Sequence, residues 1–326
     1  MKISKFSCQV ALALLVIVVL SFLYLMLGDQ NYSFSQIWHE SVVLHLRLPR
    51  LLALVFVGVL LSSSGLLVQS MTGNPIAEIS TLGISGGASF ALALLLVFNL
   101  STGGWLGTAV ASLGAFIALI TVALLTVKSK FQPMKVVLVG TSVGLFATSL
   151  ASILTFYSKN MQSYFLWIVG SFSGITPLKL EILMVVSVLF VSMVLLFANQ
   201  IKVLAFGEEM ATSLGISVNR LRLLIMVMVA LASGVTVSSV GVISFVGLMA
   251  PHSARRLVGG HFLKRFCMSN LLGVLLLLVA DLLARNLFKP YEFPAGSLTL
   301  LFGAIFFIYV MSQETNYIKS QVKTDF

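Results

Sequence analysis

Long apolar runs alternate with short polar segments along the whole chain. The runs are bounded by charged residues, Gly, Pro or Asn, and most approach the roughly 20 residues that an α-helix needs to cross a bilayer. Between Leu51 and Val127 the only charged residue is Glu78. The pattern predicts an all-α, polytopic membrane protein in which residues 1–326 form one transmembrane domain. We expect about ten spans, near residues 8–27, 47–71, 82–99, 104–127, 135–157, 180–199, 222–240, 242–258, 268–288 and 296–313.

The basic residues favour one orientation of these spans. Ten spans place both termini on the same side of the membrane. With the N-terminus in the cytoplasm, only six of the 20 basic residues fall outside, namely Arg47, Arg50, Lys159, Lys179, Arg285 and Lys289. Cytoplasmic loops of membrane proteins carry an excess of Lys and Arg, so we expect both termini to be cytoplasmic.

Composition supports the same class. Hydrophobic residues make up 59% of the chain and charged residues 9%, which leaves little for a soluble domain. The net charge of +10 could indicate nucleic acid, but the cytoplasmic loops explain it, so no nucleic-acid partner is expected. Cys8 and Cys267 both fall near the cytoplasmic side and form no CxxC pair, which favours neither a disulfide nor a thiolate metal site.

Several catalytic and cofactor motifs are absent or misplaced. No Gly is followed by Lys, so the chain lacks a Walker A loop and we expect no bound ATP or other cofactor. The stretch from Gly140 to Gly144 matches a nucleophile elbow, but it lies in a span rather than between a strand and a helix, so no catalytic residue is expected. A short amphipathic outer loop explains His39, Glu40 and His45 better than a metal site does.

The fifth predicted span carries small residues at helical spacing, at Gly140, Gly144, Ala147 and Ala151. Helix packing and the lining of a pore explain this pattern equally well. Its candidate positions along a translocation path are Ser142, Gly144, Thr148 and Ser152. The alternative is that the three hydroxyls bond their own backbone four residues earlier.

The segment between the sixth and seventh spans is bracketed by glycines on the predicted cytoplasmic face. Glu208 and Glu209 fall where a helix would start, and Gly215 fits its end. A short helix there could fit the groove of a partner protein, or it could be a simple interfacial turn. The candidate contact residues are Gly207, Glu208, Glu209, Ala211, Leu214 and Gly215.

Asp281 and Arg285 stand near the outer end of the ninth span. Charged residues at this depth are costly and are usually paired or functional. Their i, i+4 spacing puts them on one helix face, so an internal ion pair is one explanation. Such a pair would not exclude a docking role for Arg285.

These motifs together carry a family resemblance. The chain resembles the FecCD-type permeases of bacterial ABC importers for ferric siderophores, haem and cobalamin. The matching stretches follow the order of the family and lie at Arg47–Arg50, Gly73–Glu78, Leu82–Ala88, Trp167–Ser171, Leu204–Ile216, Gly241–Arg255, Asp281–Arg285 and Glu292–Gly296. Two departures stand out, because Ile305 replaces a usual Pro, which puts a local kink in doubt, and Ser244 replaces a common Gly, which puts a close backbone approach in doubt.

The resemblance implies the type II ABC importer permease architecture. Such a subunit lies in the bacterial cytoplasmic membrane, pairs with an identical or homologous permease, and binds two ATPase subunits that hold ATP and Mg²⁺. An extracytoplasmic binding protein delivers the substrate, and the resemblance implies docking through Arg47, Arg50 and Arg285. We expect an iron chelate, a ferric siderophore or haem, as substrate, with cobalamin as the alternative.

Two other classes of function fit the sequence less well. An ion-coupled secondary transporter normally needs a carboxylate near the bilayer midplane, whereas Glu78, Glu181 and Asp281 all lie at predicted span ends. An intramembrane enzyme needs a polar catalytic cluster at one depth, and the sequence offers none. A faint echo between residues 47–52 and 220–225, followed by breaks at Asn74-Pro75 and Pro251-His252, hints at two inverted halves, although chance similarity of apolar segments is a rival explanation.

Overall fold

The computed structural model describes residues 5–324 except 29, 103, 130, 288 and 290, and it places the side chains of these residues except 166, 311 and 313–324. This part of the chain is helical, with turns and short irregular connections and no strand. Ten of its helices lie where the ten spans were predicted. They are α1 (Lys5–Met26), α2 (Leu48–Thr72), α3 (Ile84–Val97), α4 (Gly104–Thr126), α5 (Pro133–Tyr157), α7 (Pro177–Leu196), α10 (Val218–Val240), α11 (Val246–Val258), α12 (Phe262–Asn286) and α13 (Ala295–Thr324).

Seven helices in the described residues are long and apolar enough to cross a membrane: α1, α2, α4, α5, α7, α10 and α12. The others are shorter or less uniformly apolar. At about 1.5 Å per residue, α3 with 14 residues and α11 with 13 each reach about 20 Å, short of a bilayer core of about 30 Å. Irregular segments before α3 and α11 therefore lie at membrane depth, where protein must surround them.

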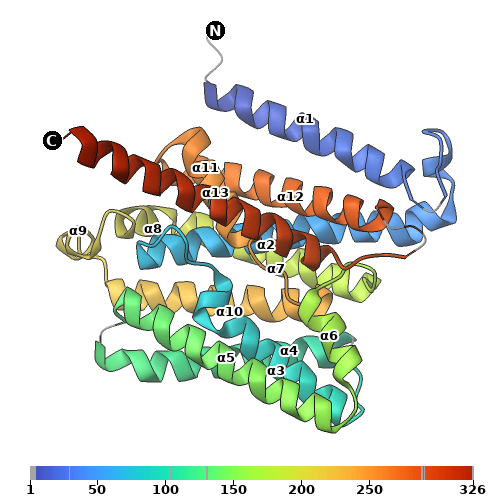
Figure 1. Ribbon diagram of the computed structural model, residues 1–326, viewed down its shortest axis with the longest axis horizontal. Helices are drawn as coiled ribbons and strands as arrows, with labels where there is room; N and C mark the ends of the chain where they lie inside the picture. Colours follow the sequence, from blue (N-terminus) through green and yellow to red (C-terminus); the bar gives the residue numbers. More distant parts are fainter. Residues whose placement is uncertain are drawn as a thin grey trace.

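Three short helices connect the long ones: α6 (Met161–Val169), α8 (Ala198–Leu204) and α9 (Glu208–Ser213). The sequence predicted only α9 among them. Shorter turns lie at η1 (Gln36–Trp38), η2 (Val43–Arg47), η3 (Ile79–Leu82) and η4 (Val127–Ser129). Helix α9 projects at the end of the molecule where α1 begins and α13 ends, and the α1–α2 connection lies at the opposite end (Figure 1).

Helices α2 and α10 form the centre of the bundle, and most of their side chains are buried. Small residues allow the backbones of two helices to approach closely. The resulting van der Waals contacts drive helix packing in lipid, where burial of apolar surface gains no hydrophobic free energy. A Cβ placed on Gly65 of α2 would lie 1.8 Å from the backbone oxygen of Gly247 in α11. One on Gly58 would lie 2.8 Å from the Cα of Val274 in α12. Glycine is therefore required at these crossings.

The order of elements repeats in two parts of the chain. A long buried helix (α2, α10) is followed by a break, a short helix (α3, α11) and two long helices (α4 and α5, α12 and α13). The start of α2 and the end of α10 lie at the same end of the bundle, since both adjoin the segment that leads into α7. The two parts are therefore inverted. The second predicted break was misplaced, because residues 241–245 form it and Pro251 lies inside α11.

Candidate functional site

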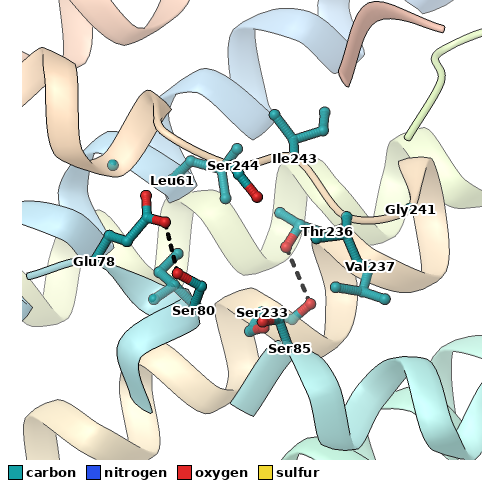
Figure 2. Close-up of a pocket in the computed structure, with 13 residues that line it drawn as sticks. Leu61, Glu78, Ser80, Ser85, Ser233, Thr236, Val237, Gly241, Ile243 and Ser244 are labelled. Carbon is teal, nitrogen blue, oxygen red and sulfur yellow. Dashed lines mark hydrogen bonds between the residues drawn. The ribbon is translucent and has the colours of Figure 1, made fainter. Parts of the chain in front are cut away.

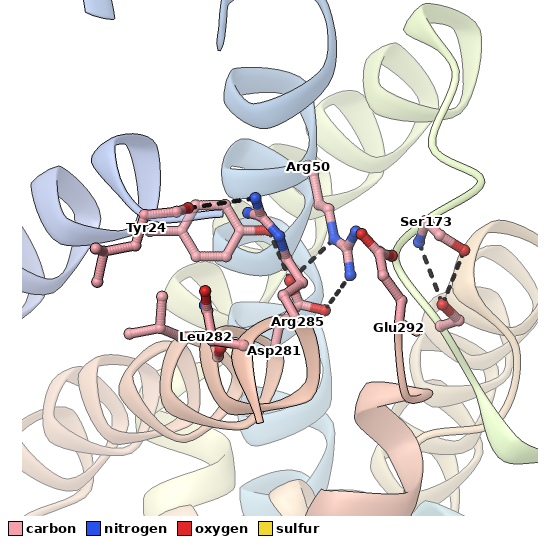
Figure 3. Close-up of polar contacts among 10 residues, drawn as sticks. Tyr24, Arg50, Ser173, Asp281, Leu282, Arg285 and Glu292 are labelled. Atoms are coloured by element: carbon pink, nitrogen blue, oxygen red, sulfur yellow. Dashed lines mark hydrogen bonds and ion pairs between the residues drawn. The ribbon is translucent and has the colours of Figure 1, made fainter. Parts of the chain in front are cut away.

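A buried ion pair joins α2 to α12 at the end of the molecule opposite α9. The Arg50 guanidinium donates from Nε to Asp281 Oδ2 over 2.9 Å and from Nη2 to Asp281 Oδ1 over 2.8 Å. A third nitrogen, Nη1, donates to Glu292 Oε2 over 2.9 Å. The Tyr24 hydroxyl of α1 donates to Asp281 Oδ2 over 2.6 Å (Figure 3). Two-pronged pairing of this kind gives a guanidinium and a carboxylate fixed geometry.

Two further arginines surround this pair. The Arg285 guanidinium lies over the Tyr24 ring, 4.8 Å from its centroid, and Arg47 lies over the Tyr32 ring at 4.9 Å. Arg47 also donates to the backbone oxygens of Leu25 (2.7 Å) and Gln30 (2.6 Å). These contacts fasten α1 and the loop after it to the bundle.

The three arginines that the resemblance implies for docking are buried, although docking would suit exposed side chains. Arg47, Arg50 and Arg285 are 5%, 8% and 7% exposed in this chain. The internal pair expected between Asp281 and Arg285 is replaced by the interhelical pair of Asp281 with Arg50. Spacing along one helix indicated Asp281 and Arg285. Tyr24 lies 257 residues before Asp281 and carried no local signal. Glu292 begins one of the stretches that resemble the family, but the sequence did not indicate that it pairs with Arg50.

A cavity of about 420 Å³ opens beside the arginine cluster. All three arginines line it, together with Glu292 and Ser173. The Arg285 Nη1 atom is buried and has no hydrogen-bond partner among the described residues. Arg285 therefore lines the cavity without an ion-pair partner among the described residues, next to the paired Arg50.

The two breaks of the inverted halves meet inside the bundle. The Glu78 carboxylate, at the start of η3, accepts the backbone N–H of Phe245 over 3.0 Å and the Ser80 hydroxyl over 2.6 Å. Figure 2 shows Glu78, Ser80 and Ser244 around one internal cavity of about 30 Å³. A carboxylate therefore ties the break after α2 to the break after α10.

Phe245 holds an unusual backbone conformation at this junction. Its φ of +68° lies in the left-handed region, which costs a non-glycine residue of order 1–3 kcal/mol. The Phe245 ring packs where a Cβ on Gly303 of α13 would clash, at 2.1 Å. Ser244 lines the small cavity, and α13 continues through Ile305 without a break. Close backbone approaches in this region are made by Gly65 against Gly247 and by Gly241 against Trp167.

Helix α9 follows Gly207, whose φ of +122° a side chain rarely adopts, and is followed by Gly215 at φ +76°. Ala211 is fully buried against the bundle. Glu208 pairs with Arg222 of α10 at 3.0 Å. Ala211 and Glu208 therefore anchor α9 to its own chain.

The outward surface of α9 and the turns beside it carries three exposed apolar side chains among polar ones. Phe206, Met210 and Leu214 are 66%, 49% and 60% exposed. Glu209 is exposed as well. Among these, the sequence prediction named Leu214 and Glu209 but missed Phe206 and Met210, although both lie in the segment that it singled out. Their exposure could be found only once the buried face of α9 was known.

Gly144, Thr148 and Ser152 are four residues apart and share one face of α5, whereas Ser142 lies on another face. The hydroxyls of Ser142, Thr148 and Ser152 donate to the backbone oxygens four residues earlier, over 2.8, 2.9 and 2.9 Å. Gly144 faces the start of α3, and its Cβ would lie 3.0 Å from the Cα of Gly83. Ser142 is exposed, whereas Thr148 and Ser152 are half-buried.

Comparison with known proteins assigns the chain to one protein family. The model of the FecCD transport family matches residues 14–313, nearly the whole chain. The chain belongs to the FecCD transport family. Among the described residues, no group of three or more His, Cys, Asp or Glu side chains is placed to hold a metal ion.

Relatives of this FecCD family member are permeases. It is 34% identical over 278 residues to the Fe(3+)-citrate import system permease protein YfmD of Bacillus subtilis (strain 168), covering 85% of this chain and 83% of YfmD. It is 33% identical over 295 residues to the vitamin B12 import system permease protein BtuC of Vibrio cholerae, covering 89% of each.

A solved structure has the same fold. It is that of a metal-chelate type ABC transporter in an inward-facing conformation, with a TM-score of 0.85 and 27% identity, covering 94% of this chain and 99% of the other.

Proposed function

We propose that this chain is the permease subunit of an ABC importer that carries an iron chelate, a ferric siderophore or haem, across the bacterial cytoplasmic membrane. The observation that carries the proposal is the family match from residue 14 to residue 313, together with 34% identity to a Fe(3+)-citrate import permease. The chain makes no covalent chemistry in this account. Its function lies in the relative stability of inward-open and outward-open packings.

The inner partner is an ABC ATPase that binds ATP and Mg²⁺. The exposed apolar surface of Phe206, Met210 and Leu214 on and beside α9 would enter a groove of that ATPase. Contiguous exposed apolar residues on a polar end of a molecule mark interaction sites. An ATPase contact on α9 places α9, the start of α1 and the end of α13 on the cytoplasmic side. This orientation agrees with the distribution of Lys and Arg.

The outer partner is a substrate-binding protein, which would dock over the arginine cluster. Arg285 offers the best contact, because it lines the 420 Å³ cavity and forms no ion pair among the described residues. Arg47 and Arg50 would contribute by shaping the cavity, since their donors are engaged within the chain. An acidic side chain of the binding protein suits this site.

A second permease, identical or homologous, would complete the translocation path. Ser142 on the exposed face of α5 would lie along that path, with Thr148 and Ser152 at its margin. Because their hydroxyls are satisfied by the backbone, they would present a weakly polar wall, which suits a bulky chelate.

Cobalamin is the second candidate substrate, because the chain is 33% identical to a vitamin B12 import permease. Transport by the complete complex in proteoliposomes separates the candidates. We expect ATP-dependent uptake of labelled iron as its citrate, siderophore or haem complex, with no uptake of labelled cobalamin. Uptake of cobalamin alone would overturn the assignment of an iron chelate and leave the permease function standing.

A further inference from the structure

A pocket of basic side chains lies at the α9 end of the bundle, outside the sites described above. It has a volume of about 280 Å³ and is formed by the end of α2, the end of α11, the start of α12 and α8. Its basic members are Lys202, Arg255 and Arg265, which come from three different helices. Convergence from three helices distinguishes this pocket from a basic stretch on one loop.

Among the described residues, no ion pair compensates the charges of this pocket. The ion pairs of the described residues join Arg50 to Asp281 and Glu292, and Arg222 to Glu208. None of them involves Lys202, Arg255 or Arg265. The Arg265 Nε atom is buried and has no hydrogen-bond partner in the described part of the chain. A buried donor without a partner is costly, and so is the repulsion of like charges that line one cavity.

Backbone geometry adds to the positive potential. Arg265 lies in the first turn of α12, where the helix dipole is positive and a basic side chain is unfavourable. An anion at this place would satisfy the guanidinium and the helix end together. The other lining residues include Gln69 and Ser70 of α2, which supply polar atoms but no negative charge.

We infer that this pocket binds the phosphate headgroup of an anionic phospholipid from the cytoplasmic leaflet. The inference rests on the proposed orientation, which places the ends of α2, α11 and α12 at that surface. Basic pockets between membrane helices on the cytoplasmic side suit such headgroups. Phe206 also lines the pocket and is 66% exposed, so an apolar group adjoins the charged one, as an amphipathic lipid requires.

The lipid would contact the segment that carries α9. Lys202 lies on α8, and Ala205 and Phe206 form the turn between α8 and α9. A bound headgroup would therefore join the ends of α11 and α12 to the base of the proposed ATPase contact. ATP hydrolysis by the complete complex should consequently rise with the fraction of anionic lipid in the membrane.

Native mass spectrometry of the full chain in detergent tests the binding step directly. The probes are phosphatidylglycerol and, as the uncharged comparator, phosphatidylcholine. Arg255→Gln and Arg265→Gln should each weaken phosphatidylglycerol binding roughly fivefold, the loss expected for one basic residue at an anionic surface. Arg256→Gln is the matched control, because Arg256 is exposed on the same helix as Arg255 and does not line the pocket.

Four results would overturn the inference. The first is equal affinity for the two lipids, and the second is an equal loss in Arg256→Gln. The third is stabilisation by inorganic phosphate as strong as that by phosphatidylglycerol, which would point to a free anion. The fourth is loss of ATPase copurification in Arg255→Gln and Arg265→Gln with lipid affinity unchanged, which would assign the pocket to an acidic side chain of the ATPase.

Thermal unfolding in detergent without anionic lipid supplies a check on folding. Arg265→Gln should be at least as stable as the parent, since the Nε atom has no partner to lose. A marked fall in its unfolding temperature would assign Arg265 a role inside the chain and contradict the inference. Neither the lipid-binding measurement nor the unfolding measurement requires transport. Failure of the transport assay would therefore leave the test of lipid binding unaffected.

Discussion

The ion pair of Arg50 and Asp281 shows how the chain holds charges within a helical bundle. Asp281 is fully buried and accepts from Arg50 and Tyr24, so its charge is both paired and hydrogen-bonded. Desolvation offsets much of the attraction in such a pair, but removing one partner leaves a buried charge without compensation. The pair therefore fixes how α1, α2 and α12 meet more than it adds to stability.

Arg50→Ala should lower the free energy of unfolding by about 3–5 kcal/mol, because Asp281 would keep a buried negative charge. The double variant Arg50→Met/Asp281→Leu should recover most of that loss, since neither charge remains. Thermal or detergent-induced unfolding of the purified protein measures both. Arg220→Ala is the control, because Arg220 is exposed. A single variant as stable as this control would contradict the account of the pair.

The sequence indicated which charged residues belong to the arginine cluster, but not which side chains they contact. Arg47, Arg50, Asp281 and Arg285 could be singled out because charges near span ends are unusual. Their pairing across helices depends on which helices are neighbours, and hydropathy contains no information on that. For the same reason the sequence could not show that the arginines are buried.

Helix positions, by contrast, follow from the hydrophobic pattern alone. Each of the ten predicted spans overlaps one observed helix, because lipid demands a continuous apolar stretch whose backbone is hydrogen-bonded within the segment. The short helices α6 and α8 were not predicted, since few residues carry too little periodicity. The break before α11 was placed wrongly because Pro251 is tolerated inside that helix.

Close helix crossings give a prediction about packing. Gly65→Ala would force a methyl group into the backbone of Gly247, so α2 and α11 would have to separate. We expect a strong loss of folded protein after extraction, measured by size-exclusion chromatography of a fluorescent fusion. Gly260→Ala should behave like the parent, because nothing lies within 4 Å of its Cβ position and its φ is not positive. Similar yields for both variants would refute the packing argument.

Some residues of the α9 segment anchor it to its own chain, and others are exposed on its outward surface. Leu214→Glu should abolish copurification of the ATPase with little change in stability, since Leu214 is exposed. Ala211→Leu should also weaken that contact, but by displacing α9 from its seat, so the chain should become less stable as well. Pull-down of the ATPase combined with thermal unfolding distinguishes the two. Normal capture by the Leu214→Glu variant would rule out an ATPase contact on this surface.

The molecule contains two inverted parts, α2–α5 and α10–α13, whose breaks meet at Glu78 and Phe245. Inverted repeats let one half move against the other, which suits alternating access. The start of α2 and the end of α12, which carry the arginines, lie at one end of the molecule and α9 at the other (Figure 1). Binding at either end can therefore bias the same motion, which is the physical requirement for coupling a binding protein to an ATPase.

Uptake driven by ATP tests the central claim most directly. The complex of this permease, its ATPase and its binding protein is placed in proteoliposomes with a labelled ferric chelate outside and ATP inside. The account predicts accumulation that needs ATP, needs the binding protein and is lost in the Leu214→Glu variant. Accumulation driven by an ion gradient without ATP, or unaffected by loss of the ATPase contact, would contradict it.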